Sequence, residues 1–126
     1  MPPSLDPYTI VQADAGANYG ALKSFAEKEV EKHYPGISTI VRPGLIVGPL
    51  DPSDRFTYWP VRIDKGGMVV APGKPTDPAQ FVDARDLAEW MVRMAENREF
   101  GTYNATGPAT PFTMGELLYG IKSVTT

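Results

Sequence analysis

Residues 18–49 read NYGALKSFAEKEVEKHYPGISTIVRPGLIVGP, a helical pattern followed directly by a strand pattern. At about 100° of rotation per residue, the apolar side chains of the first part fall on one side of a helix that begins near Asn18 and continues to His33. Pro35-Gly36 ends this helix, and the β-branched residues at 37–42 are typical of a buried parallel strand. Together these patterns predict an α/β fold in which the apolar side of the helix is buried.

The first turn of this helix contains a tyrosine and a lysine one turn apart. Tyr19 falls in the apolar sector and Lys23 on its shoulder, whereas four other charged residues fall on the opposite side, namely Glu27, Lys28, Glu31 and Lys32. A cation beside a phenol favours the phenolate form. Such a tyrosine can exchange a proton with a substrate oxygen while a hydride moves at the adjacent carbon. The Tyr-x-x-x-Lys spacing is weakly specific by itself, so its meaning depends on the rest of the chain.

The composition limits the classes of function. At 126 residues, with 42% hydrophobic and 21% charged side chains, we expect one small globular domain or a piece of a larger one. A net charge of −3 without a basic patch argues against a nucleic-acid partner, and the lack of a long apolar run argues against a membrane. With no cysteine and one histidine, His33, we expect no metal site, and a cytoplasmic location is compatible with the lack of cysteine.

The segment after the predicted strand contains proline, glycine and two arginines. Pro43 cannot donate to a β-ladder, so regular pairing is expected to end just before it, and Gly44 allows a backbone or a ligand to approach closely. The residues at 51–54 predict a helix start. Arg55 and Arg62 are expected to share a face of that helix. A solvated surface is the commoner role for such arginines, and binding of an anionic group is the alternative.

The remaining elements alternate between helix and strand. Upstream, residues 1–17 are expected to form a loop or linker with a short extended segment at 8–11. Downstream we expect a turn at 66–67, a strand at 68–71, a polar loop at 72–78 and a short extended segment at 80–82. These are followed by a helix at 83–98 that is capped by an aspartate, a strand at 101–105, and a last helix at 113–121 that is opened by a capping box.

Four blocks of the chain stand in a recognisable order. They are Tyr19-x-x-x-Lys23, Val41-Arg42-Pro43-Gly44-Leu45-Ile46-Val47-Gly48-Pro49, Gln80-Phe81-Val82-Asp83-Ala84-Arg85-Asp86-Leu87-Ala88, and Gly101-Thr102-Tyr103-Asn104-Ala105. Each block is loose alone, but four in this order and spacing are specific. From about residue 17 to the end, the chain resembles the extended short-chain dehydrogenase/reductases, in particular the NAD-dependent epimerase/dehydratase group.

The resemblance implies a fold and a set of site residues. The fold would be a partial doubly wound, Rossmann-like parallel sheet, with the catalytic helix and following strand at 18–49, a small substrate-binding lobe at 50–79, and a return to the sheet and a terminal helix at 80–126. Tyr19 would be the catalytic acid/base, and Lys23 would favour its ionised form and bind the nicotinamide ribose. The segment Pro43-Gly44-Leu45 would lie against the nicotinamide of NAD or NADP. Arg55 would contact a small-molecule substrate, which would then be anionic.

Two features of the family are missing from this sequence. It has no G-x-G-x-x-G turn for a dinucleotide. The upstream hydroxyl residues other than tyrosine, Ser4 and Thr9, stand in a proline-rich stretch rather than on a strand before Tyr19. We therefore expect the catalytic half of such an enzyme, a fragment inactive alone. Half a sheet leaves an open strand edge and an apolar face, so we expect a homo-oligomer with the helix of Tyr19 as a candidate interface.

Two other interpretations stay open. A non-enzymatic binding or scaffold protein on the same fold would keep Tyr19 and Lys23 as relics, and a Tyr19→Phe change would then leave its function unchanged. An independent small α/β binding domain would make the resemblance accidental. Within the preferred interpretation, the reaction is epimerisation, dehydration or reduction.

Overall fold

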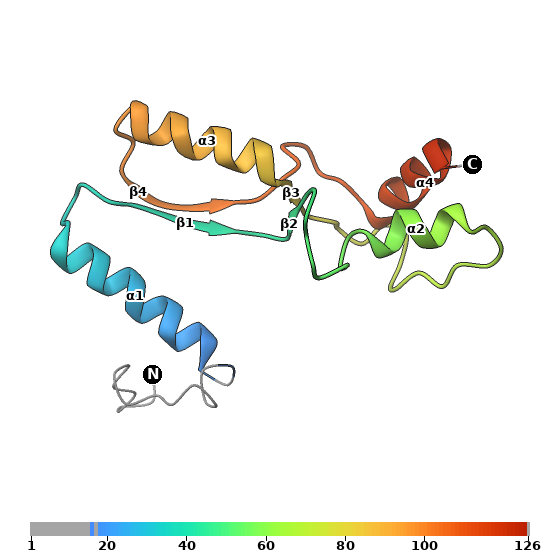
Figure 1. Cartoon of the computed structure of the whole chain (residues 1–126), viewed down its shortest axis with the longest axis horizontal. Coiled ribbons are helices and arrows are strands. Elements are labelled where there is room, and N and C mark those ends of the chain that lie inside the picture. The colour runs from blue at the N-terminus through green and yellow to red at the C-terminus, as the bar shows by residue number, and fades with distance from the viewer. Residues whose placement is uncertain (1–15, 17, 126) are drawn as a thin grey trace. The chain divides into compact units, whose positions relative to one another are not determined.

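The computed structural model describes Gly16 and residues 18–125 (Figure 1). In this part of the chain the elements are α1 (Tyr19–His33), β1 (Thr39–Pro43), β2 (Ile46–Val47), α2 (Tyr58–Asp64), β3 (Val82–Asp83), α3 (Ala84–Glu96), β4 (Gly101–Ala105) and α4 (Met114–Thr125). The expected α/β class is confirmed. The loop expected at 1–17 and its extended segment at 8–11 lie outside the described residues, apart from Gly16. No helix in the described part has the length and apolar character needed to cross a membrane.

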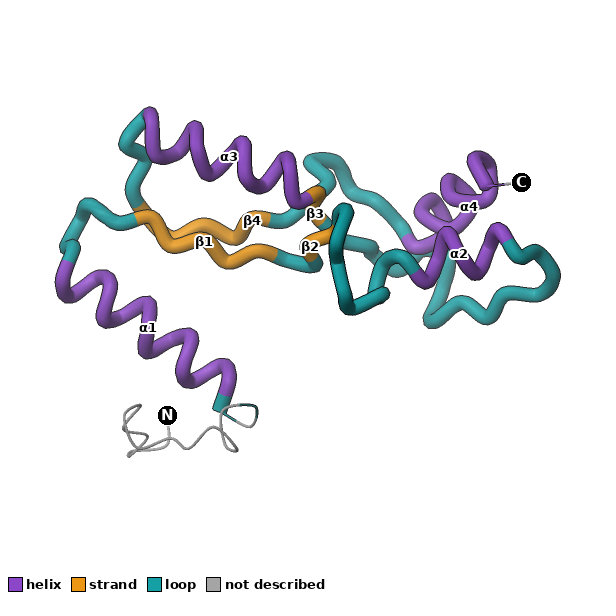
Figure 2. The backbone as a smooth tube through the Cα atoms, viewed as in Figure 1, coloured by secondary structure: helices purple, strands orange, loops and turns teal. Residues whose placement is uncertain are grey.

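The strands form two separate two-stranded sheets (Figure 2). Strand β1 pairs with β4, and the two run in the same direction. The direction follows because the Gly101 N–H donates to the Ser38 carbonyl oxygen (3.0 Å), while farther along both strands the Gly44 N–H donates to the Ala105 carbonyl oxygen (3.1 Å). Strands β2 and β3 are also parallel, in the register Ile46↔Val82 and Val47↔Asp83.

Strand β1 was expected to be buried, and this prediction is wrong. Its first three residues are half-buried, and Arg42 and Pro43 are exposed. The reason is that β1 has a single partner strand among the described residues, whereas a buried parallel strand has neighbours on both edges and layers on both faces. Proline has no backbone N–H to donate to a neighbouring strand, and Pro43 is tolerated because an edge position does not require that hydrogen bond.

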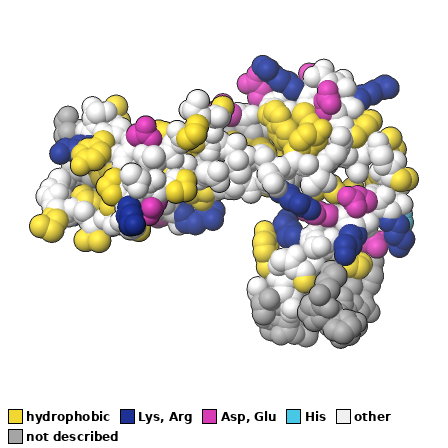
Figure 3. Space-filling model, turned by 180° about the vertical axis from the view of Figure 1, so that it is seen from behind, with side chains coloured by type: hydrophobic (Ala, Val, Ile, Leu, Met, Phe, Trp, Pro, Cys, Tyr) yellow, Lys and Arg dark blue, Asp and Glu magenta, His cyan; other side chains and the backbone are white. Residues whose placement is uncertain are grey.

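The chain divides into two compact units. The first consists of Met1–Ile40 and Met94–Tyr103, and the second of Val41–Arg93 and Asn104–Thr126. Among the described residues, the five hydrophobic side chains that are less than a tenth exposed all belong to the second unit: Val47, Ile63, Ala79, Leu87 and Leu117. Many other hydrophobic side chains are open to solvent, as the face shown in Figure 3 illustrates.

The first unit is built on α1, and its ends agree with the sequence prediction. The helix follows Asn18, and it ends where the Tyr34 N–H donates to the Val30 carbonyl oxygen (2.8 Å) and Gly36 adopts a positive φ of 72°. The expected burial of its apolar side is wrong. The helix contains no buried residue, and Tyr19 is 65% exposed. The physical reason is a lack of cover, because the described remainder of this unit is a short connection, the end of α3 and parts of two strands.

The second unit has a small hydrophobic core. Helix α2 packs against α4 and buries Ile63. The ring of Phe81 stands between two others, with centroids 5.1 Å from Phe56 and 5.9 Å from Phe112. The segment before β3 also binds the start of α4, because the Ala79 N–H donates to the Phe112 carbonyl oxygen (2.9 Å). These contacts surround α4 with apolar and hydrogen-bonding partners, and Leu117 is correspondingly only 8% exposed.

Two helix starts in the second unit confirm the predicted caps. At α4, the Thr113 N–H donates to Glu116 Oε2 (2.8 Å) and the Glu116 N–H donates to Thr113 Oγ1 (3.2 Å), which is a reciprocal capping box. The hydrogen bonds from Thr113 lower the pKa of Glu116. At α3, Asp83 Oδ1 accepts the Arg85 N–H (2.7 Å), and both carboxylate oxygens accept from the Arg85 guanidinium. These bonds lower the pKa of Asp83 to about 2.

The helix start expected at 51–54 is wrong. Asp51 Oδ1 accepts hydrogen bonds from the backbone N–H (2.9 Å) and the hydroxyl (2.6 Å) of Ser53. An aspartate that binds the residue two positions ahead stabilises a turn, and such a turn competes with helix. Asp54 then takes a positive φ of 53°, and α2 begins only at Tyr58.

The strand expected at 68–71 is also wrong, although the turn before it is confirmed. Gly66 and Gly67 both adopt positive φ values, 68° and 73°. The following residues belong to no strand. Instead, the guanidinium of Arg62 on α2 donates to the carbonyl oxygen of Gly66 (2.8 Å) and to that of Met68. Residues 68–71 have the composition of a strand, but no strand of the described part of the chain pairs with them, and a strand exists only with a partner.

Candidate functional site

The structure brings Tyr19 and Lys23 together at the start of α1. The Lys23 ammonium nitrogen lies 5.9 Å from the centroid of the Tyr19 ring, within the range of a cation–π contact. Both side chains are exposed. The pair therefore has the one-turn geometry predicted from the sequence, but it stands at an open helix end rather than at the margin of a buried face.

The surroundings of this pair are open within the described part of the chain. A Cβ added at the neighbouring Gly20 would meet no heavy atom within 4 Å. Proton transfer by a phenol is most effective where water is excluded and a substrate oxygen is held within hydrogen-bond reach. Tyr19 and Lys23 provide the chemical groups for such a transfer, and a further surface must cover them.

The segment Pro43-Gly44-Leu45 lies at the end of β1, in the second unit. The Gly44 N–H is already bonded to Ala105, and a Cβ added at Gly44 would lie 3.2 Å from the Thr106 methyl carbon Cγ2. A side chain does approach the Gly44 backbone closely, as predicted for a glycine, but it belongs to Thr106. The Leu45 carbonyl oxygen accepts the Val82 N–H (2.9 Å).

The two arginines play different parts. Arg55 lies before α2, exposed, and its Nε donates to Ser53 Oγ (3.0 Å); its terminal guanidinium nitrogens form no hydrogen bond within the residues described. Arg62 lies on α2 and uses both terminal nitrogens on carbonyl oxygens. They do not share a helical face, because Arg55 precedes the helix. Arg55 thus keeps donors for an anion, whereas Arg62 stabilises the following turn.

The turn before Arg55 contains a carboxylate, that of Asp51. Hydrogen bonds from the Ser53 hydroxyl and N–H lower the pKa of Asp51, with a smaller effect from the Arg55 charge. The second carboxylate oxygen of Asp51 is buried and has no hydrogen-bond partner in the described part of the chain. The carboxylate next to Arg55 is therefore ionised at neutral pH and offsets part of the positive charge offered to an anion.

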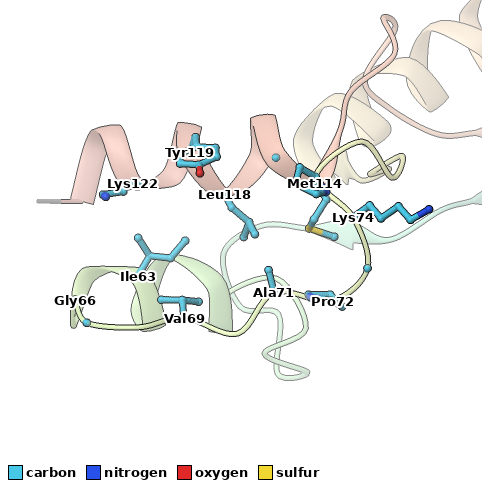
Figure 4. A pocket seen from close by; sticks show the side chains of 14 residues that line it. Ile63, Gly66, Val69, Ala71, Pro72, Lys74, Met114, Leu118, Tyr119 and Lys122 are labelled. Atoms are coloured by element: carbon cyan, nitrogen blue, oxygen red, sulfur yellow. The ribbon is translucent and has the colours of Figure 1, made fainter.

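A cavity that the sequence did not reveal lies in the second unit (Figure 4). It measures about 470 Å³ and lies between α2, the segment after it, and α4. The lining is mostly apolar, and its charged groups are Lys74 and Lys122. The residues that line it are Ile63, Gly66, Gly67, Val69, Ala71, Pro72, Gly73, Lys74, Pro75, Met114, Gly115, Leu118, Tyr119 and Lys122.

The volume of this cavity lies in the range of small-molecule and side-chain pockets. Sequence reasoning missed it because its walls come from segments about fifty residues apart, and no motif spans them. The available signal was the strand-like composition of 68–71 beside a glycine pair, which indicated an extended apolar segment in need of a partner.

No group of three or more histidine, aspartate and glutamate side chains in the described residues is arranged to hold a metal ion. Compared with known proteins, the chain matches no protein family, no curated protein and no solved structure. The resemblance to the extended short-chain dehydrogenase/reductases is therefore carried by the four sequence blocks alone.

Proposed function

We propose that this chain provides the acid/base half of an NAD(P)-dependent epimerase/dehydratase or reductase, on part of a Rossmann-like sheet. The observation that supports this most is the contact of Lys23 with the ring of Tyr19. Helix α1 leads into the parallel strand β1, and β3, α3 and β4 follow in the order of the sequence blocks. This order of helices and parallel strands supports the proposal.

In the proposed reaction, Tyr19 handles a proton at a substrate oxygen. In the reducing direction its hydroxyl gives the proton to the carbonyl oxygen, and in the oxidising direction the phenolate takes the proton back. The Lys23 ammonium lies beside the Tyr19 ring. A bound NAD or NADP would supply hydride chemistry at the adjacent substrate carbon, and Lys23 has N–H donors that would hold its ribose. Arg55 is the proposed contact for a small anionic substrate.

The residues present fit the acid/base role better than they fit a complete dinucleotide site. Tyr19 and Lys23 are exposed and available. The sequence lacks a glycine-rich phosphate turn, and the open side of Gly44 already faces Thr106. We therefore propose that the chain alone binds no cofactor and that a dinucleotide-binding unit completes the site.

We further propose that the chain forms a homo-oligomer through α1 and acts in the cytoplasm. Helix α1 buries nothing and exposes Tyr19, Val30 at 40% and the following Tyr34 at 59%. Apolar side chains so exposed are typical of an interaction surface. Sedimentation velocity at micromolar concentration tests this proposal, and a well-folded monomer would contradict it.

Titration with NADH, followed by cofactor fluorescence, tests the absence of a complete dinucleotide site. We expect no saturable binding up to about 1 mM, a level at which even a weak site would be detected. Saturable binding that Lys23→Met abolishes and Lys28→Met preserves would show that the chain builds a cofactor site by itself, and the half-enzyme proposal would be wrong.

The acid/base role is tested by reconstitution. The chain is mixed with the separately expressed dinucleotide-binding half of an extended short-chain reductase, and hydride transfer to a panel of carbonyl compounds is measured. We expect Tyr19→Phe to lower the rate about 100-fold or more, the usual contribution of a positioned general acid. Tyr34→Phe, an exposed tyrosine just after the same helix, is the matched control and should have no effect. Activity that survives Tyr19→Phe would exclude the proposed role.

One observation favours a second function, that of a binding protein. The cavity between α2 and α4 measures about 470 Å³, and its lining contains none of the predicted catalytic residues. A binding protein would lose its partner when this cavity is altered and would keep it in Tyr19→Phe. The two functions therefore respond to different substitutions.

A further inference from the structure

We draw no further inference here: the strongest candidate, the mostly apolar cavity of about 470 Å³ between α2, residues 66–75 and α4, has a largely exposed loop segment as one of its walls, and nothing in the structure shows what covers it.

Discussion

In this chain, the side chains suited to proton transfer and the buried hydrophobic residues belong to different units. The first unit carries Tyr19 and Lys23, a pair suited to proton transfer, on a helix that buries no residue. The second unit carries the five most buried hydrophobic residues and the cavity, whose charged lining groups are two lysines. A helical pattern in the sequence therefore predicts where a helix begins and ends, and does not predict whether another element covers it.

The difference in burial follows from what each helix can contact. Helix α4 packs on α2, and its first residues are bound by the preceding segment, since the Met114 N–H donates to the Asp77 carbonyl oxygen (2.8 Å) and the Gly115 N–H to that of Pro75 (2.9 Å). Helix α1 has a longer sequence pattern but no such partner in the described part of its unit. Tertiary contacts, rather than amphipathicity alone, decide which helix becomes part of a core.

The largest expected effect on stability comes from removing a leucine from each helix. Leu117→Ala should lower the free energy of unfolding by about 2–3 kcal/mol, because it leaves a cavity at a residue that is 8% exposed. Leu22→Ala on α1 removes the same atoms from a half-buried position and should cost less than about 1 kcal/mol. Urea denaturation followed by circular dichroism, which reports the helices of both units, measures both. Equal costs would show that α1 is packed as tightly as α4.

Much of the secondary structure could be predicted because its signals are local. The end of α1 follows from Pro35-Gly36, and the start of α4 follows from the Thr113 and Glu116 pair. The errors occur where the answer depended on distant residues. Among the residues that the structure describes, the 68–71 segment has no partner strand, and at 51–54 the side chain of Asp51 stabilises a turn in place of a helix. Strand pairing and side-chain competition are not visible in a local pattern.

The candidate site was predictable to the same extent. The Tyr19 and Lys23 contact could be predicted because one helix sets the spacing of both residues. The open surroundings of the pair could not be predicted, since they depend on which elements fail to cover α1. The cavity between α2 and α4 was missed because the residues of its walls, such as Val69 and Leu118, meet only through the packing of two helices.

A smaller effect distinguishes the starts of the same two helices. Thr113→Ala removes the hydroxyl and half of the capping box, and it should destabilise the second unit by about 1 kcal/mol. Asn18 makes no side-chain capping bond to α1, so Asn18→Ala should cost less stability than Thr113→Ala. Thermal unfolding followed by circular dichroism compares the two variants with the unaltered chain. A larger loss for Asn18→Ala would contradict the described start of α1.

The smallest expected effect is a loss of stability at low pH, and it originates in the second unit. Asp51, Asp83 and Glu116 all have a lowered pKa there, each because hydrogen bonds favour the carboxylate. For Asp83 the folded pKa is about 2 and the ordinary value is 3.8, so the native state holds its proton more weakly than the unfolded chain. Its contribution is therefore complete above pH 3.8 and decreases as the pH falls toward 2.

Asp83→Asn tests this assignment because asparagine cannot ionise and still accepts the Arg85 N–H. Between about pH 5 and pH 2.5, the unfolding temperature of the unaltered chain should fall more than that of the variant. Trp59 and Trp90 both belong to the second unit, so their fluorescence reports the part of the chain concerned. Glu29→Gln on α1 is the matched control, since it removes a carboxylate from the other unit and should leave the acid dependence as it was. Parallel curves for the unaltered chain and Asp83→Asn would show that the Asp83–Arg85 pair does not stabilise the start of α3.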